Sequence, residues 1–291
     1  MRLTALAVLA LAGLPLPALG QDAFRTVGTD LRDAGHDALR IWTAPLHTRW
    51  RDVPVIGTSA GAALLVYAAD RPLEDWVRHH QRSALVGAAT PFRDGQPLAG
   101  LGKAVPLTLI SAGLYSLGLA TGKRSLRDAG LGCAGAVLAG SLVRHLVYAT
   151  VSRARPSVTQ TPSDWALRHG DWNHRSFFGG HTANMMTCTT FLASRFQLGP
   201  LEPLLYAVGL DVGLARTVDG DHWPSDNFVA AVVGYATGRL EARRSAARAA
   251  AGSPRAASPS ATALAALAGG REGVSILPGA GGALLAVSIR F

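Results

Sequence analysis

The chain has 291 residues, of which 48% are hydrophobic and 16% are charged, and its formal net charge is +9. This apolar content is ample for a sizeable core, and the charged fraction is low for a soluble protein. No basic patch is interleaved with aromatic residues and no nucleic-acid-binding motif occurs, which argues against nucleic acid as a partner. The positive charge favours anionic lipid headgroups or phosphorylated substrates instead.

The first twenty residues have the pattern of a secretory signal peptide. Arg2 precedes an apolar run at 3–14, and small residues at 18–20 precede Gln21. This apolar run is short for a membrane span, which favours a cleaved signal peptide over an uncleaved anchor. We therefore expect residues 1–20 to be removed and the remaining chain to be exported.

Residues 21–240 are predicted to form one mostly helical domain. Three long apolar stretches are followed by three shorter ones: 53–69, 104–121, 129–143, 183–193, 203–215 and 228–237. Runs of about 17 apolar residues or more can cross a bilayer, whereas runs of roughly 10–14 more often mark buried core helices. The number of true membrane spans therefore stays open. Abundant glycine and alanine favour closely packed helices.

Three short blocks in the second half of the chain combine basic residues with histidines. They are Arg153-Ala154-Arg155-Pro156, then Phe178-Gly179-Gly180-His181-Thr182, then Arg216 with His222 and Asp226. A guanidinium is a permanently charged planar fork that matches oxyanion geometry, and two imidazoles can divide nucleophilic attack from leaving-group protonation. A carboxylate four residues after a histidine can lie one helical turn away and orient its ring. Together these groups suffice for metal-free phosphoryl transfer through a phosphohistidine.

The three blocks resemble the signature motifs of the type 2 phosphatidic acid phosphatase superfamily. That superfamily includes lipid phosphate phosphatases, bacterial acid phosphatases and vanadate haloperoxidases, and its motifs read Lys-x6-Arg-Pro, Pro-Ser-Gly-His and Ser-Arg-x5-His-x3-Asp. Here the third motif has its full spacing, and the other two match at Arg155-Pro156 and Gly180-His181. The resemblance covers about residues 100–240 and implies an all-α helical bundle.

The resemblance also implies a role for each matched residue. His222 would be the nucleophile that becomes phosphohistidine, and Asp226 would hold its ring in the reactive tautomer. His181 would protonate the leaving oxygen and then activate water. Arg155 and Arg216 would bind the phosphoryl oxygens, together with the backbone at the start of the helix that follows the second motif.

That backbone position is Gly180, and Tyr148 takes the place of the family lysine among the phosphate-binding positions. No metal ligands are evident, and neither a metal nor another cofactor is expected. The implied substrate is a phosphate monoester or diphosphate, lipid-linked because the site lies among apolar helices. The implied location is the bacterial cell envelope, facing the periplasm, as a soluble or membrane-associated enzyme in contact with the membrane.

The chain departs from the family pattern at several positions. Tyr148 replaces the lysine, Gly179 and Ala215 replace the two serines, and Phe178 replaces the proline. A charge-assisted hydrogen bond contributes roughly 1.5–3 kcal/mol, so these losses should weaken oxyanion binding without removing the nucleophile or the acid.

Two features can compensate for the missing groups. Arg144 lies four residues before Tyr148, on the same helical face, and either reaches the phosphate or merely caps an apolar helix. Gly179 keeps a backbone N–H, which is an anion donor at a helix start.

Two alternative functions remain open. One is a non-catalytic envelope protein that binds phosphate or lipid with a degenerate site, which the missing lysine motivates. The other is a vanadate-dependent haloperoxidase, in which His222 would be a vanadate ligand; the lost donors count against it.

Three remaining features complete the sequence predictions. Cys133 and Cys188 lie in apolar segments, and two buried thiols are favoured over a bond that an exported compartment would permit. The polar loop 157–176 contains two tryptophans and should lie over the active site. Residues 241–272, rich in Ala, Arg, Ser and Pro, are predicted to be a flexible linker, and residues 273–291 a short C-terminal β-hairpin.

Overall fold

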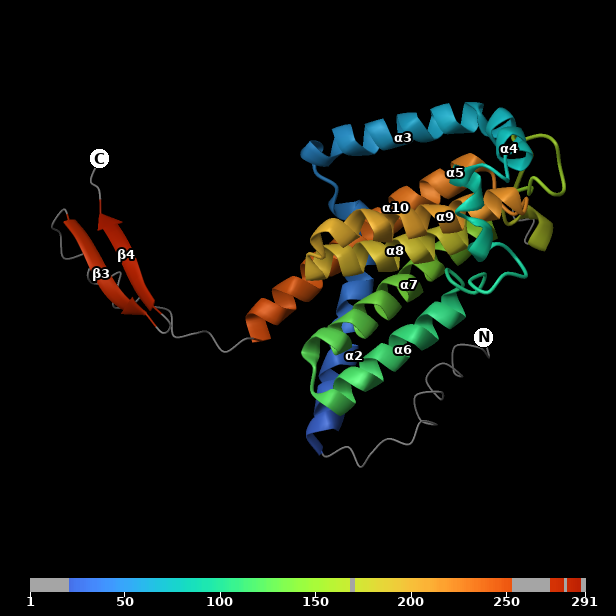
Figure 1. The fold of residues 1–291 in the computed structure, drawn as a ribbon. Helices are drawn as coiled ribbons and strands as arrows, with labels where there is room; N and C mark the ends of the chain where they lie inside the picture. Colours follow the sequence, from blue (N-terminus) through green and yellow to red (C-terminus); the bar gives the residue numbers. More distant parts are fainter. Residues whose placement is uncertain (1–20, 168–170, 253–272, 280–281, 289–291) are drawn as a thin grey trace. The chain divides into compact units, whose positions relative to one another are not determined.

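The computed structural model describes residues 21–167, 171–252, 273–279 and 282–288 (Figure 1). The described chain is mostly helical, which confirms the predicted all-α class. It divides into two compact units, one ending at Ala246 and the other spanning Ala247–Phe291. The predicted signal peptide and residues 253–272 of the predicted linker lie outside the described residues.

All six predicted apolar stretches are helical. They form α3 (Val53–Ala68), α6 (Ala104–Thr121), α7 (Arg124–Thr150), α8 (Gly180–Phe196), α9 (Glu202–Val218) and α10 (Pro224–Gly252). Several run past the apolar stretch because polar residues continue the same helix. The end of α6 is marked by Gly122, whose φ of 67° is a left-handed conformation that costs glycine least.

An amphipathic N-terminal helix, α2 (Gln21–Thr43), packs on α7. Its Asp30 accepts a hydrogen bond from Tyr115 of α6 and pairs with Arg127 of α7, and Trp42 Nε1 donates to Ala139 O at 3.2 Å. The remaining short elements before α6 are η1 (Ala44–His47), η2 (Trp50–Asp52), α4 (Asp70–His79), α5 (Ala84–Gly87) and η3 (Thr90–Phe92).

Small residues let the central helices approach closely, as the glycine content predicts. A Cβ added at Gly130 of α7 would lie 2.6 Å from Tyr115 N of α6. One added at Gly234 of α10 would lie 2.6 Å from Ala183 O of α8. Real Cβ atoms do not approach backbone that closely, so larger side chains at these positions would push the helices apart.

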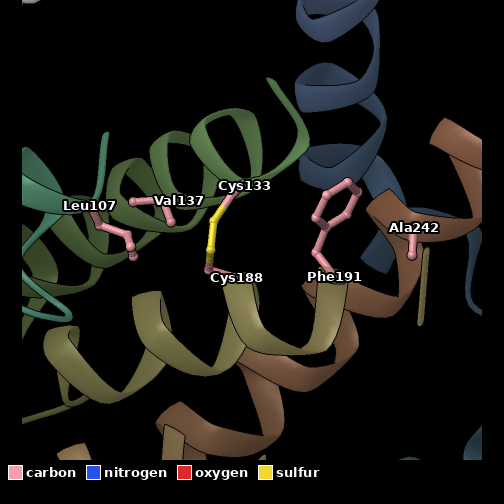
Figure 2. Close-up of a cluster of buried hydrophobic side chains, with 6 residues drawn as sticks. All are labelled: Leu107, Cys133, Val137, Cys188, Phe191 and Ala242. Carbon is pink, nitrogen blue, oxygen red and sulfur yellow. A yellow bond between two sulfur atoms is a disulfide. The ribbon is translucent and has the colours of Figure 1, made fainter. Parts of the chain in front are cut away.

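A disulfide joins Cys133 of α7 to Cys188 of α8, so the prediction of two buried thiols is wrong. Figure 2 shows the bond inside a cluster that also contains Leu107, Val137, Phe191 and Ala242. The Cα atoms of the two cysteines are 4.8 Å apart, within the range that a disulfide requires. Helix packing brings together two residues that are 55 positions apart in sequence.

The predicted linker is helical over its first part. Residues 241–252 continue α10, and Glu241 is 3% exposed. Burial raises the pKa of Glu241 to about 7. Alanine and arginine are strong helix formers, so the composition that suggested a linker also suits a helix.

Two helices, α6 and α7, are long and apolar enough to cross a bilayer, and α3 with α4 would add a third as a bent pair. No residue of α3 is buried, and its Leu64 and Leu65 are 68% and 75% exposed.

Two small antiparallel sheets complete the fold. Strand β1 (Val151–Arg153) pairs with β2 (Trp165–Leu167), with Arg153 opposite Trp165. Strands β3 (Gly273–Gly279) and β4 (Gly282–Ser288) form the predicted hairpin, in a register from Gly273↔Ser288 to Gly279↔Gly282. The turns η4 (Trp172–His174) and η5 (Gly199–Leu201) precede α8 and α9.

Candidate active site

The structure brings the three sequence blocks together at one end of the helical unit. Arg155 follows β1, His181 lies in the first turn of α8, and Arg216 is in the last turn of α9. His222 lies in the tight connection between α9 and α10, where its N–H donates to Arg216 O at 3.4 Å. Residues separated by up to 67 positions therefore share one site.

The ring of His222 is held by a backbone carbonyl. Its Nδ1 lies 2.6 Å from Ser176 O, and the side chain is 3% exposed. A carbonyl oxygen only accepts hydrogen bonds, so Nδ1 must carry the proton and Nε2 must keep its lone pair. Burial, followed by the charges of Arg155 and His181, lowers the pKa of His222 well below its ordinary value. The ring is thus neutral, in the tautomer that leaves Nε2 nucleophilic.

The predicted role of Asp226 in holding the His222 ring would pass through Ser176, because Ser176 O is the hydrogen-bond partner of His222 Nδ1. Asp226 Oδ2 accepts hydrogen bonds from Ser176 Oγ at 2.5 Å and Trp223 N at 3.2 Å. Ser176 links the two residues, because its hydroxyl donates to Asp226 and its carbonyl accepts from His222. The carboxylate therefore acts through Ser176.

The other oxygen of Asp226 pairs with Arg153, an arginine to which the sequence alone assigns no role. Arg153 Nη1 lies 2.5 Å from Asp226 Oδ1, and its Nη2 lies 2.6 Å from Asp70 Oδ2. All three side chains are at most 1% exposed. Burial raises the pKa of Asp226 to about 6, while Arg153 acts to lower it. Arg153 is the counter-charge of this buried network.

Arg155 and Arg216 meet on one carboxylate. Arg155 Nη1 donates to Asp221 Oδ1, and Arg216 Nη1 donates to Asp221 Oδ2 at 3.1 Å. Arg216 also pairs with Asp94 at 2.8 Å and with Asp219 at 2.9 Å. Asp221 thus spans the two guanidiniums that are predicted to hold a phosphate.

Arg216 keeps a donor for another anion. Among the described residues, Arg216 Nε is buried and has no hydrogen-bond partner. Arg155 uses Nε for Trp172 O at 3.0 Å, and its guanidinium lies 4.3 Å from the centre of the Trp172 ring. The predicted loop over the site therefore contributes Trp172, whereas His169 of that loop lies outside the described residues.

His181 is partly buried beside several cations. Within the described chain its Nε2 has no hydrogen-bond partner. Burial, then the charges of Arg216, Lys103 and Arg144, lowers the pKa of His181 to about 3, while Asp94 acts in the opposite direction. The ring is neutral at neutral pH while the site is empty. A bound phosphate anion would offset these cations and raise the His181 pKa again.

The positions that depart from the family pattern have structural explanations. Tyr148 Oη donates to Phe178 O at 3.1 Å, so its single proton is already used, contrary to its predicted place among the phosphate ligands. An added Cβ at Gly179 would collide with Asn227 Oδ1, which leaves no room for the family serine. The Gly179 N–H donates to Asp226 O at 3.3 Å and is not the free anion donor that was expected.

Gly180 begins α8, so its N–H is one of the donors that a helix leaves unpaired at its first turn. Sequence reasoning missed Asp70, Asp94, Lys103, Ser176 and Asp221 as neighbours of the site. Of these, only Asp221 and Ser176 lie close to the motifs in sequence. The position of Asp221 next to His222 was the one sequence signal that could have identified a neighbour of the site. In the described part of the chain, no three His, Cys, Asp or Glu side chains are grouped so that they could hold a metal ion.

Comparison with known proteins finds one family. Residues 129–249 match the model of the PAP2 superfamily, and the matched segment contains all three sequence blocks together with α8, α9 and most of α7 and α10. The chain has no significant match among curated proteins or among solved structures.

Proposed function

We propose that this protein is a metal-free phosphatase acting through a phosphohistidine at His222, because residues 129–249 match the PAP2 superfamily, whose members act as phosphatases on phosphate esters. The observation that carries the proposal is the contact of His222 Nδ1 with Ser176 O, which leaves Nε2 unprotonated. This atom lies in a site with two arginines: Arg216 Nε has no hydrogen-bond partner among the described residues, and the hydrogen bonds of Arg155 use its Nε and Nη1.

In the proposed mechanism His222 Nε2 attacks phosphorus as the bond to the leaving oxygen breaks. Arg155 and Arg216 stabilise the charge that spreads over the phosphoryl oxygens. His181, protonated together with substrate binding, gives its proton to the leaving oxygen. It then takes a proton from the water that attacks phosphohistidine, which releases phosphate and restores His222. The Ser176 carbonyl accepts the hydrogen bond from Nδ1 and stabilises the positive charge that the His222 ring carries once Nε2 is phosphorylated.

We further propose that the substrate is a lipid-linked phosphate monoester or diphosphate in the cell envelope. Two observations support this: α6 and α7 are apolar enough to cross a bilayer, and α3 exposes large apolar side chains. The disulfide supports export, because such bonds persist in oxidising compartments. Cell fractionation with a protease-accessibility assay would test the periplasmic location.

A direct test measures phosphate release from an aryl phosphate by the purified full-length protein, with and without a metal chelator. We expect turnover that the chelator does not reduce. Binding of inorganic phosphate without turnover would instead identify the non-catalytic alternative. Peroxide-dependent halide oxidation after addition of vanadate would identify the haloperoxidase.

The role of His181 predicts a dependence on the leaving group. Replacing His181 by alanine should reduce turnover of alkyl phosphates far more than turnover of activated aryl phosphates, whose leaving groups need little protonation. The contribution of general acid catalysis is about 10²–10⁴-fold, which sets the expected difference between the two substrate classes. Comparing kcat for both classes in the wild type and in His181→Ala measures it. Equal losses would mean that His181 is not the acid.

A further inference from the structure

Arg144 is a cation of this site without a counter-charge among the described residues. Across the described residues it makes no ion pair and no hydrogen bond, and its Nε is buried without a partner. By contrast, Arg155 pairs with Asp221, and Arg216 pairs with three carboxylates. A partly buried guanidinium without an anion reduces the stability of the empty protein. A ligand that supplies an anion would remove this loss of stability.

The guanidinium of Arg144 lies against the first residue of α8. A Cβ added at Gly180 would be 2.7 Å from Arg144 Cζ and would collide with Nη1, so the absent side chain of Gly180 makes room for the arginine. The charge of Arg144 also acts on His181, the next residue. The guanidinium is therefore placed beside both the unpaired N–H groups of the helix start and the candidate acid.

Tyr148 and Arg144 share one face of α7. Arg144 Cζ lies 5.9 Å from the centre of the Tyr148 ring, and the Tyr148 hydroxyl is bound to Phe178 O. Tyr148, at the family lysine position, thus holds the second-motif loop. Arg144, one turn earlier, places a positive charge at the end of that loop, beside Gly180. An arginine side chain is longer than that of lysine, which matches a position one turn further away.

We propose that Arg144 binds the phosphoryl oxygens in place of the missing lysine, so that the phosphate-binding charge of this chain has moved one helical turn along α7. This inference rests on the proposed function for its substrate, but the binding of phosphate itself is independent of turnover. The phosphate is held by three arginines, and Tyr148 only positions the loop that ends at Gly180.

The test compares binding of inorganic phosphate to the full-length wild type and to Arg144→Gln by titration calorimetry. We expect Arg144→Gln to bind phosphate at least about tenfold more weakly, because it loses a charge-assisted hydrogen bond. Without phosphate the variant should have an unchanged or higher melting temperature, since an unpaired buried charge is removed. A lower melting temperature combined with unchanged phosphate affinity would identify a structural role and overturn the proposal.

Two further lysines serve as comparisons. Lys123 is exposed at the other end of α7, so Lys123→Gln removes one positive charge far from the site. This variant should bind phosphate as the wild type does. Lys103 is the competing candidate, because its charge also acts on His181. A loss in Lys103→Gln with none in Arg144→Gln would assign the phosphate to Lys103 and overturn the proposal.

A rescue experiment separates replacement of the lysine from a general effect of charge. In the wild type, Tyr148→Lys should bring no gain, because Arg144 already lies beside the ring and would repel an ammonium. In the Arg144→Gln background the same substitution should restore phosphate affinity to within a few-fold of the wild type. Failure of this rescue in a folded double variant would contradict the relocation.

These measurements also distinguish the failure of this inference from that of the proposed function. A wild type that binds phosphate through Arg144 but does not hydrolyse aryl phosphates would exclude the phosphatase and leave the binding role of Arg144 intact. If the wild type hydrolyses aryl phosphates and Arg144→Gln leaves phosphate affinity unchanged, the phosphatase proposal stands and the binding role of Arg144 is excluded.

Discussion

Replacing His222 by alanine is expected to reduce phosphatase turnover by at least about 10⁴-fold, because removal of a nucleophile leaves only binding and electrostatic effects. The ring is 3% exposed and its Nδ1 is held by Ser176 O, so Nε2 is the ring atom that remains for attack on phosphorus. Initial rates with an aryl phosphate measure the loss. Acid quenching during turnover should trap acid-labile phosphate on the wild type and none on His222→Ala.

His79 provides a matched control. It lies on α4, and its Nδ1 contacts Asp75 O of the same helix at 2.7 Å. His79→Ala should retain full turnover and the same circular dichroism spectrum. Substantial residual turnover in a folded His222→Ala protein would exclude His222 as the nucleophile.

The second large effect concerns stability. Replacing Arg153 by leucine should destabilise the helical unit by about 3–5 kcal/mol, because Asp70 and Asp226 would then be buried without their counter-charge. Both carboxylates are fully buried, and Arg153 lies within 2.6 Å of each. Its guanidinium also lies near two aromatic rings, 4.9 Å from the centre of Tyr67 and 5.0 Å from that of Trp165. Chemical denaturation monitored by circular dichroism would measure the loss.

A second ion pair, Arg195 with Asp128, is the comparison. Its side chains are 17% and 19% exposed, so water shares in their solvation. Arg195→Leu should therefore cost about 1 kcal/mol or less. If the two substitutions cost the same, the burial of the Arg153 network does not determine its energy. Because Asp226 holds Ser176, Arg153→Leu should also lower kcat in the fraction that stays folded.

The helices and the three blocks could be predicted from the sequence because their signals are local. Apolar runs and the spacing of Arg216, His222 and Asp226 can be read directly along the sequence, without knowledge of packing. The extent of α10 was missed: it continues to at least Gly252, twelve residues beyond the predicted boundary at 240, because alanine and arginine are strong helix formers.

The contacts that orient the site could not be predicted, because they do not depend on a residue type or on proximity in sequence. His222 is held by the carbonyl of Ser176, a group that every residue carries. Arg153 finds Asp70, which is 83 positions earlier in the chain. The departure at Gly179 likewise depends on Asn227, whose side chain reaches the second motif only through tertiary packing.

The disulfide lies on the same two helices that carry the phosphate site. Cys133 precedes Arg144 on α7 by eleven residues, about three helical turns, and Cys188 follows His181 on α8 by seven, about two turns. The bond therefore prevents α7 from sliding along α8. A slip of a single residue would shift Arg144 by about 1.5 Å relative to His181, and a displacement of about 1 Å can cost 10²-fold in rate. Whether the Cys133–Cys188 disulfide is formed or reduced therefore affects how accurately Arg144 and His181 are positioned.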